Sequence, residues 1–149
     1  MKIDQVKRDN VNLIKQDSEE QWKKSIPSFI KMCDLEAESS QVQVDHMPLN
    51  KDMTVVDLCC GSGRWAIPIA KKVKQVTVVD NSQEMLDACM ERAKNAGLDN
   101  IEPVLMNIFD ADSGNNIKIH DAVVCSRSVA MRDLAFLSSF ASKLAVIGS

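Results

Sequence analysis

The chain has 149 residues, of which 45% are hydrophobic and 26% charged, and its net charge is −3. This length suits about one domain with its own core. The acidic balance argues against a nucleic-acid-binding surface, and no apolar run approaches the ~20 residues of a membrane span. Because the first residues also lack a signal-peptide pattern, we expect a cytoplasmic protein with no membrane partner and no indicated nucleic-acid partner.

The cysteines and histidines do not suggest a metal site or a disulfide framework. The five cysteines are an odd number, and none forms a C-x-x-C pair. The two histidines, His46 and His120, have no ligand partner at helical spacing. We therefore expect reduced thiols that act as small apolar residues, and no bound metal.

Residues 1–49 are mostly polar with a helical pattern, which indicates an N-terminal helical extension. Apolar residues recur at helical spacing between Trp22 and Cys33. Pro27 lies inside this run and predicts a kink or a restart of the helix. Residues 37–50 are predicted to be a connector.

Residues 50–149 alternate strand and helix. Strands are predicted at 53–59, 75–80, 101–107 and 120–126, and helices at 64–74, 83–96 and 131–144. Residues 144–149 are either a short fifth strand or the turn before one. Such alternation implies a parallel sheet with right-handed crossovers. We predict a doubly wound α/β domain whose four strands have the order 3-2-1-4.

A glycine loop and a strand-end acid mark the candidate site. Gly61 and Gly63 lie between the first strand and the following helix, where glycine lets a ligand lie directly on the main chain. Asp80 ends the second strand, where an acid can accept both hydroxyls of a ribose. Together they predict a cofactor that contains a nucleoside.

The segment G-S-G-R-W-A also fits a dinucleotide fingerprint. Asp57 argues for a different ligand, because it stands four residues before Gly61. A carboxylate so close to the loop would oppose a pyrophosphate and would suit a cationic group. The loop is also longer than the tight turn of a dinucleotide site.

Three segments, "VVDLCCGSG", "VTVVDNSQEML" and "VLMNIFD", resemble the first signature segments of class I S-adenosylmethionine-dependent methyltransferases. The resemblance covers residues 50–149. It implies that S-adenosylmethionine is the cofactor and that its methionine end is lined by Asp57, Gly61 and Gly63. Cys59, which stands where the family often has a glycine, is counted with these cofactor-binding residues.

The same resemblance assigns the rest of the cofactor. Asp80 would hold the ribose hydroxyls, and Asn81 and Met85 would flank the adenine. Asn107 falls where the family usually has an acid that contacts the adenine amino group, and Ile108 would offer a backbone contact. Cys125, at the end of the fourth strand, would lie beside the transferable methyl group.

The expected function is therefore methyl transfer from S-adenosylmethionine to an unknown acceptor, with a small molecule favoured. No catalytic residue is assigned, although Ser126 and Arg127 are positioned to matter. The absence of an N-P-P-Y-like segment after the fourth strand argues against the subtype with this segment, which methylates nucleobase or amide nitrogens. Two alternatives stay open: a non-catalytic cofactor-binding or scaffold domain, and an NAD-dependent oxidoreductase.

The number of strands departs from the resemblance, because the family's sheet usually has seven strands and only four are predicted here. The fourth strand, residues 121–126, would then have one side without a neighbour, which favours association. We expect this edge to be covered by a strand from residues 144–147, by a second copy of the chain, or by a further segment, and of these we favour a homodimer through the exposed edge.

Overall fold

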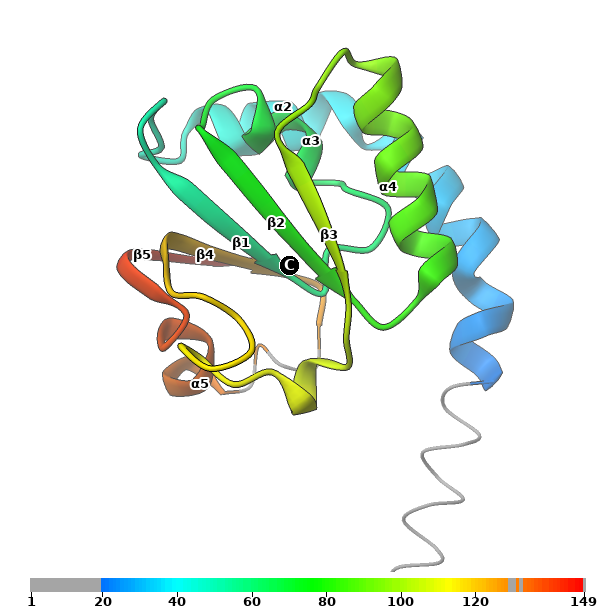
Figure 1. Ribbon diagram of the computed structural model, residues 1–149. Helices are drawn as coiled ribbons and strands as arrows, with labels where there is room; N and C mark the ends of the chain where they lie inside the picture. The colour runs from blue at the N-terminus through cyan, green and yellow to red at the C-terminus, as the bar shows by residue number, and fades with distance from the viewer. Residues whose placement is uncertain (1–19, 129–130, 132, 149) are drawn as a thin grey trace, which may run out of the picture.

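The computed structural model describes residues 20–128, 131 and 133–148. They form a five-stranded sheet of order β3-β2-β1-β4-β5, in which every pair of neighbours is parallel (Figure 1). The strands are β1 (Thr54–Leu58), β2 (Gln75–Asp80), β3 (Ile101–Leu105), β4 (His120–Ser126) and β5 (Ala141–Gly148). The predicted doubly wound α/β domain and the 3-2-1-4 order are thus confirmed, with one strand added beside β4.

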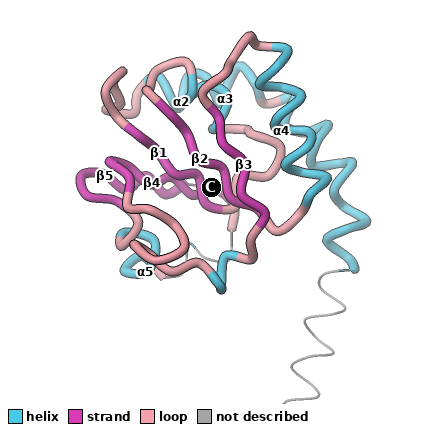
Figure 2. The backbone as a smooth tube through the Cα atoms, in the orientation of Figure 1, coloured by secondary structure: helices cyan, strands magenta, loops and turns pink. Residues whose placement is uncertain are grey.

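The two faces of the sheet carry separate hydrophobic cores. On one face Val55, Val76 and Val124 pack with buried side chains of α3 (Ala66–Ala70) and α4 (Gln83–Asn95). On the other face Val56 and Val123 pack with side chains around α5 (Leu134–Ser138). The strands are apolar on both sides because neither face meets water, as expected of a parallel sheet. Figure 2 shows the helical cover on both sides of the strands.

The N-terminal segment is more helical than expected. Residues 20–35 form one helix, which continues through Pro27 and is interrupted at Glu36 instead. The predicted connector is wrong in its first part, because α2 (Ala37–Asp45) occupies it. Lys72 holds this helix to the sheet domain, since its Nζ donates to the carbonyl of Val44 at 2.9 Å. Residues 1–19 of the predicted extension lie outside the described part.

Of the expected covers for the edge of the fourth strand, the strand from residues 144–147 is confirmed, and the favoured homodimer is not. β5 pairs with β4 along its length, with Val123 opposite Ala145, so that β4 is an interior strand. The helix predicted over residues 131–144 is correspondingly short, and residue 132 lies outside the described part. Leu137 and Phe140 are fully buried in the core on the α5 side of the sheet, which we call the lower core. The chain then turns into β5. A homodimer through the edge of β4 has no basis in this arrangement.

Within the described ranges no helix is both long enough and apolar enough to cross a membrane. Nor do the residues whose positions are described include a group of three or more histidine, cysteine, aspartate or glutamate side chains placed to hold a metal ion.

Candidate functional site

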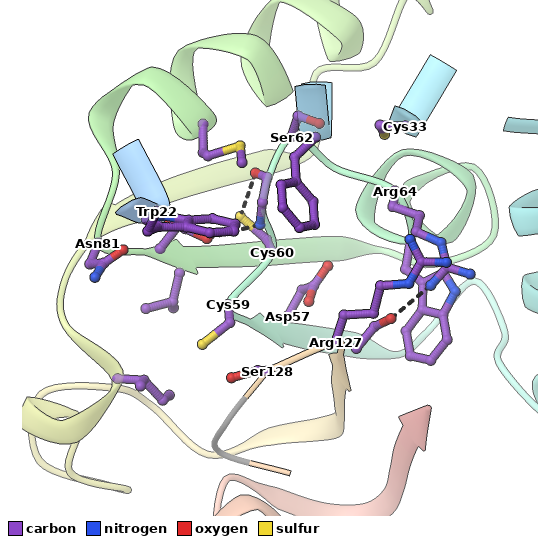
Figure 3. Close-up of a pocket in the computed structure, with 18 of the residues that line it drawn as sticks. Trp22, Cys33, Asp57, Cys59, Cys60, Ser62, Arg64, Asn81, Arg127 and Ser128 are labelled. Carbon is purple, nitrogen blue, oxygen red and sulfur yellow. Dashed lines mark hydrogen bonds between the residues drawn. The ribbon is translucent and has the colours of Figure 1, made fainter. Parts of the chain in front are cut away.

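A cavity of about 530 Å³ lies at the carboxyl ends of β1, β2, β3 and β4. Its volume is within the range of small-molecule and cofactor pockets. The strand order reverses between β1 and β4, and open α/β sheets bind ligands at such a switch point. Figure 3 shows the side chains that converge there, from the loops after the strands and from the N-terminal helix.

The loop after β1 is held by the end of β2. The Cys60 amide donates to the Val79 carbonyl at 3.0 Å, and the Gly61 amide donates to Oδ2 of Asp80 at 2.9 Å. Gly61 has φ +56°, and Cys59 has φ 61° although it carries a side chain. The left-handed backbone of Cys59 explains why a glycine is the common choice at this position, and local strain of this kind often occurs at functional sites.

Asp80 ends β2 and faces the cavity, although only 7% of it is exposed. Its two oxygens accept from the Gly61 amide and, at 3.0 Å, from the Ser82 amide. Burial raises the pKa of Asp80, and these backbone N–H groups oppose the rise. Each carboxylate oxygen offers two lone-pair directions, so the group has acceptor capacity left for two ligand hydroxyls.

Asp57 lies in β1 and is 2% exposed, yet it also lines the cavity. No hydrogen bond from the described residues reaches its carboxyl group. Burial raises the pKa of Asp57 well above its ordinary value, and the negative charge of Asp80 raises it further. A buried carboxylate without a partner is costly, so this position suits a cationic group of a ligand.

All four residues expected around the adenine line the cavity, namely Asn81, Met85, Asn107 and Ile108. Met85 is buried in α4, which Ser82 caps, and its side chain lines the cavity. The Asn107 Oδ1 accepts from the Phe109 amide at 3.0 Å and so caps the 3-10 helix η1 (Ile108–Asp110). Its second lone pair is left for a ligand donor.

Two expected site residues do not line the cavity. A Cβ on Gly63, which has φ +92°, would lie 2.8 Å from Sγ of Cys89 and 3.1 Å from Cγ1 of Ile67. Gly63 therefore allows close packing of the loop against helices rather than the approach of a ligand. Cys125 is fully buried in the lower core, where burial raises the pKa of its thiol to about 12. Its neighbour Ser126 reaches the cavity instead.

The N-terminal helix supplies site residues that the sequence did not single out. Trp22, Phe29, Met32, Cys33 and Glu36 line the cavity from above, and we call these five residues the roof. The rings of Trp22 and Phe29 lie with centroids 4.8 Å apart. Their helical spacing was a usable signal for an apolar face, but nothing in the sequence shows which part of the domain that face covers.

A cluster of three charged residues closes one end of the cavity. Arg127, directly after β4, makes two hydrogen bonds of 2.8 Å to the carboxylate of Glu36. The Nε of Arg64 lies 3.3 Å from the same carboxylate, and its Nη1 donates to Oγ of Ser126 at 2.7 Å. The pKa of Glu36 is lowered, mainly by its hydrogen bond to Arg127.

The fold and the site together define a doubly wound α/β domain built to hold a nucleoside-containing ligand at its switch point. A family model described as a methyltransferase domain matches residues 55–146. The chain belongs to this family of methyltransferase domains. The match includes every strand of the sheet except the first residue of β1 and the last two of β5.

Two curated relatives show how far the likeness extends. The 23S rRNA (uracil(1939)-C(5))-methyltransferase RlmD of Aliivibrio salmonicida is 40% identical over 55 residues, 37% of this chain and 13% of the relative. The demethylmenaquinone methyltransferase of Listeria welshimeri is 33% identical over 73 residues, 47% of this chain and 31% of the relative. The chain therefore spans a third or less of the length of these two relatives.

Solved structures agree with the fold. TYW2 of M. jannaschii in complex with AdoMet superposes with a TM-score of 0.59 at 22% identity, covering 71% of this chain and 48% of that one. Coclaurine N-methyltransferase bound to N-methylheliamine and SAH superposes with a TM-score of 0.54 at 25% identity, covering 77% and 34% of the two chains.

Proposed function

We propose that the cavity binds S-adenosylmethionine and that the chain transfers its methyl group to a small-molecule acceptor. One observation carries the proposal: Asp80 and Asp57 face the same cavity, Asp80 held by backbone donors and Asp57 without a hydrogen bond from any described residue. Two acids with these surroundings match a ligand that has a ribose and a positive charge. The family, and the AdoMet in the complex of the similar TYW2, support this ligand.

In this proposal the residues of the cavity fall into three groups, which would hold the nucleoside, face the methionine end and form the roof. Asp80 would accept the ribose hydroxyls, and the wall of Asn81, Met85, Asn107 and Ile108 would hold the adenine. Asp57, Cys59 and Gly61 would face the methionine end, where the cofactor is cationic. Residues 50–149 would thus carry the cofactor site, and the extension up to residue 49 would supply its roof.

When bound, the cofactor supplies an electrophilic methyl group on a sulfonium. The residues of the chain would contribute alignment and exclusion of water rather than covalent chemistry. Trp22 and Phe29 cover the cavity, and the buried side chain of Met85 forms part of its wall. The loop after β4, with Ser126 and Arg127, would place the acceptor, because it borders the switch point of the sheet.

A small acceptor is favoured by the charge of the chain and by the cover over the site. The net charge of −3 opposes a nucleic-acid backbone, and the N-terminal helix stands over the cavity. Among the similar proteins, one is named for a ribosomal RNA and another for a demethylmenaquinone, so these names support more than one class of acceptor. A cytoplasmic location stays a prediction from the sequence.

Isothermal calorimetry with S-adenosylhomocysteine and, separately, NADH tests the proposal on the full chain. We expect saturable binding of the first and none of the second, and the reverse result would favour the oxidoreductase alternative. Release of S-adenosylhomocysteine from S-adenosylmethionine in the presence of small nucleophiles then tests transfer. Cofactor binding without turnover on any acceptor would favour a non-catalytic binding domain.

A further inference from the structure

Among the described residues, two guanidinium groups and a single carboxylate lie at one end of the cavity. Arg64 and Arg127 both line the cavity, and both contact Glu36. The other polar partners of Arg64 are neutral, since Nη1 donates to Ser126 and Nη2 donates to Oε1 of Gln43 at 3.0 Å. Glu36 therefore compensates for one of the two positive charges.

The excess charge is partly withdrawn from water. The side chain of Arg64 is 13% exposed, and its buried Nε donates no hydrogen bond to the described residues, although it lies in ion-pair range of Glu36. Burial lowers the pKa of Arg64, and the charge of Arg127 lowers it further. The two guanidinium groups therefore favour an anion at this place, because buried charges are costly unless they are paired.

The geometry at Arg127 already accommodates a carboxylate. Its two parallel hydrogen bonds to Glu36 are both 2.8 Å long, which is the bidentate arrangement that arginine favours. The residue has φ 54°, in the left-handed region where a side chain is strained. Such strain directly after β4, at the switch point, is typical of a residue that serves a site.

The charged end lies apart from the nucleoside end. Figure 3 shows Arg64 and Arg127 together on one side of the cavity and Asn81 on the other. Apart from Glu36, the roof near the arginines is apolar, since Nη1 of Arg127 lies 3.5 Å from Sδ of Met32, and Phe29 lies one helical turn before Met32. A ligand at this end would therefore meet a cationic wall and an apolar cover.

We propose that Arg64 and Arg127 form a subsite for a carboxylate of the methyl acceptor, which takes the place of Glu36 on the two guanidinium groups. The inference rests on the proposed methyl transfer and names its substrate class: a small molecule with an apolar body and a carboxylate. Glu36 occupies the subsite when no acceptor is bound, and it ties the N-terminal helix to the loop after β4.

The test uses the full chain saturated with S-adenosylhomocysteine and titrated by calorimetry with benzoate or with benzamide, its neutral isostere. We expect benzoate to bind at least tenfold more tightly than benzamide. Arg127→Gln is expected to abolish this preference, because the bidentate partner is lost. Glu36→Gln is expected to strengthen benzoate binding severalfold, because the competing carboxylate is gone.

A matched control separates recognition from anchoring of the helix. Arg92 also holds the N-terminal helix, through the Ile30 carbonyl at 2.8 Å and Asp34 at 2.6 Å, and Arg92 does not line the cavity. Arg92→Gln should leave the preference for benzoate unchanged. Equal weakening of benzoate by the Arg127, Glu36 and Arg92 variants would overturn the proposal, because it would show a purely structural cluster. Thermal unfolding of each variant confirms that it is folded.

Two further outcomes are distinguishable. If Arg127→Gln weakens S-adenosylhomocysteine more than tenfold and leaves 5′-methylthioadenosine unchanged, the anion at the subsite is the amino-acid carboxylate of the cofactor, and the acceptor subsite is overturned. If S-adenosylhomocysteine does not bind the wild type, the proposed function fails. The preference for benzoate over benzamide is then measured on the free chain, and equal binding of the two overturns the subsite as well.

Discussion

Replacing Asp80 by alanine is expected to weaken binding of S-adenosylhomocysteine by about 2–3 kcal/mol. The carboxylate would accept two charge-assisted hydrogen bonds from the ribose, and each bond to a charged group contributes about 1.5–3 kcal/mol. Burial raises the pKa of Asp80, so part of that gain offsets the cost of holding the charge in the cavity. A loss of about 2–3 kcal/mol corresponds to roughly a 30- to 150-fold higher Kd.

Calorimetry on the full chain measures this change, and two variants guard its interpretation. Asp80→Asn retains one acceptor oxygen toward the Gly61 loop, so we expect about a tenfold effect. Asp87→Ala removes an exposed carboxylate of α4, which is bonded to Gln83 at 2.8 Å outside the cavity, and it should change nothing. Thermal unfolding confirms that both chains are folded. Equal affinities of wild type and Asp80→Ala for S-adenosylhomocysteine would then refute the assignment of the ribose to Asp80.

Three other predictions follow from single positions. Gly63→Ala is expected to lower the free energy of unfolding by about 1–3 kcal/mol, because its Cβ would overlap Sγ of Cys89, and to leave the affinity for S-adenosylhomocysteine unchanged. Urea unfolding and calorimetry measure the two quantities, and a loss of affinity without a loss of stability would contradict this prediction. Burial holds the pKa of Asp57 above that of the unfolded chain, so the ligand-free wild type loses stability as pH rises from about 4 through the raised pKa. Asp57→Asn should therefore stabilise the chain more at pH 8 than at pH 5 in thermal unfolding, and a difference that is independent of pH would speak against a buried acid. Trp22 lines the cavity, so its fluorescence in a Trp65→Phe background should change when S-adenosylhomocysteine is added; an unchanged spectrum at saturation would show that the roof does not meet the cofactor.

The central strands could be predicted because their sequences permit few alternatives. Runs such as "TVVDL" and "QVTVVD" are β-branched and apolar on both faces, and each ends in polar or glycine residues. β5 was harder to predict, since Leu134, Leu137 and Leu144 fit a helical period. The structure ends the helix at Ser138, because Leu137 anchors it in the lower core. Spacing alone does not tell where a helix gives way to a strand.

The floor of the site was predictable for a topological reason, and the roof was not. Parallel strands bring their carboxyl ends to one edge, so Asp80 and Asn107 had to approach the loop that holds Gly61. The position of the N-terminal helix depends on contacts far apart in the chain, such as those between Arg92 and the Ile30 carbonyl. No local pattern encodes such a contact. The reason for Gly63 was missed likewise, because Cys89 comes from the next helix.

The charges around the cavity point to a ligand-free chain that is less stable than its complexes. Asp57 and Asp80 are both buried at the floor, and the charge of Asp80 makes ionisation of Asp57 harder. At the other end Arg64 and Arg127 share one carboxylate. In the proposed complex a cationic cofactor group would face Asp57, and an anionic acceptor would face the arginines. The two bound ligands would carry opposite charges in one cavity and would attract each other. Binding of one should therefore strengthen binding of the other.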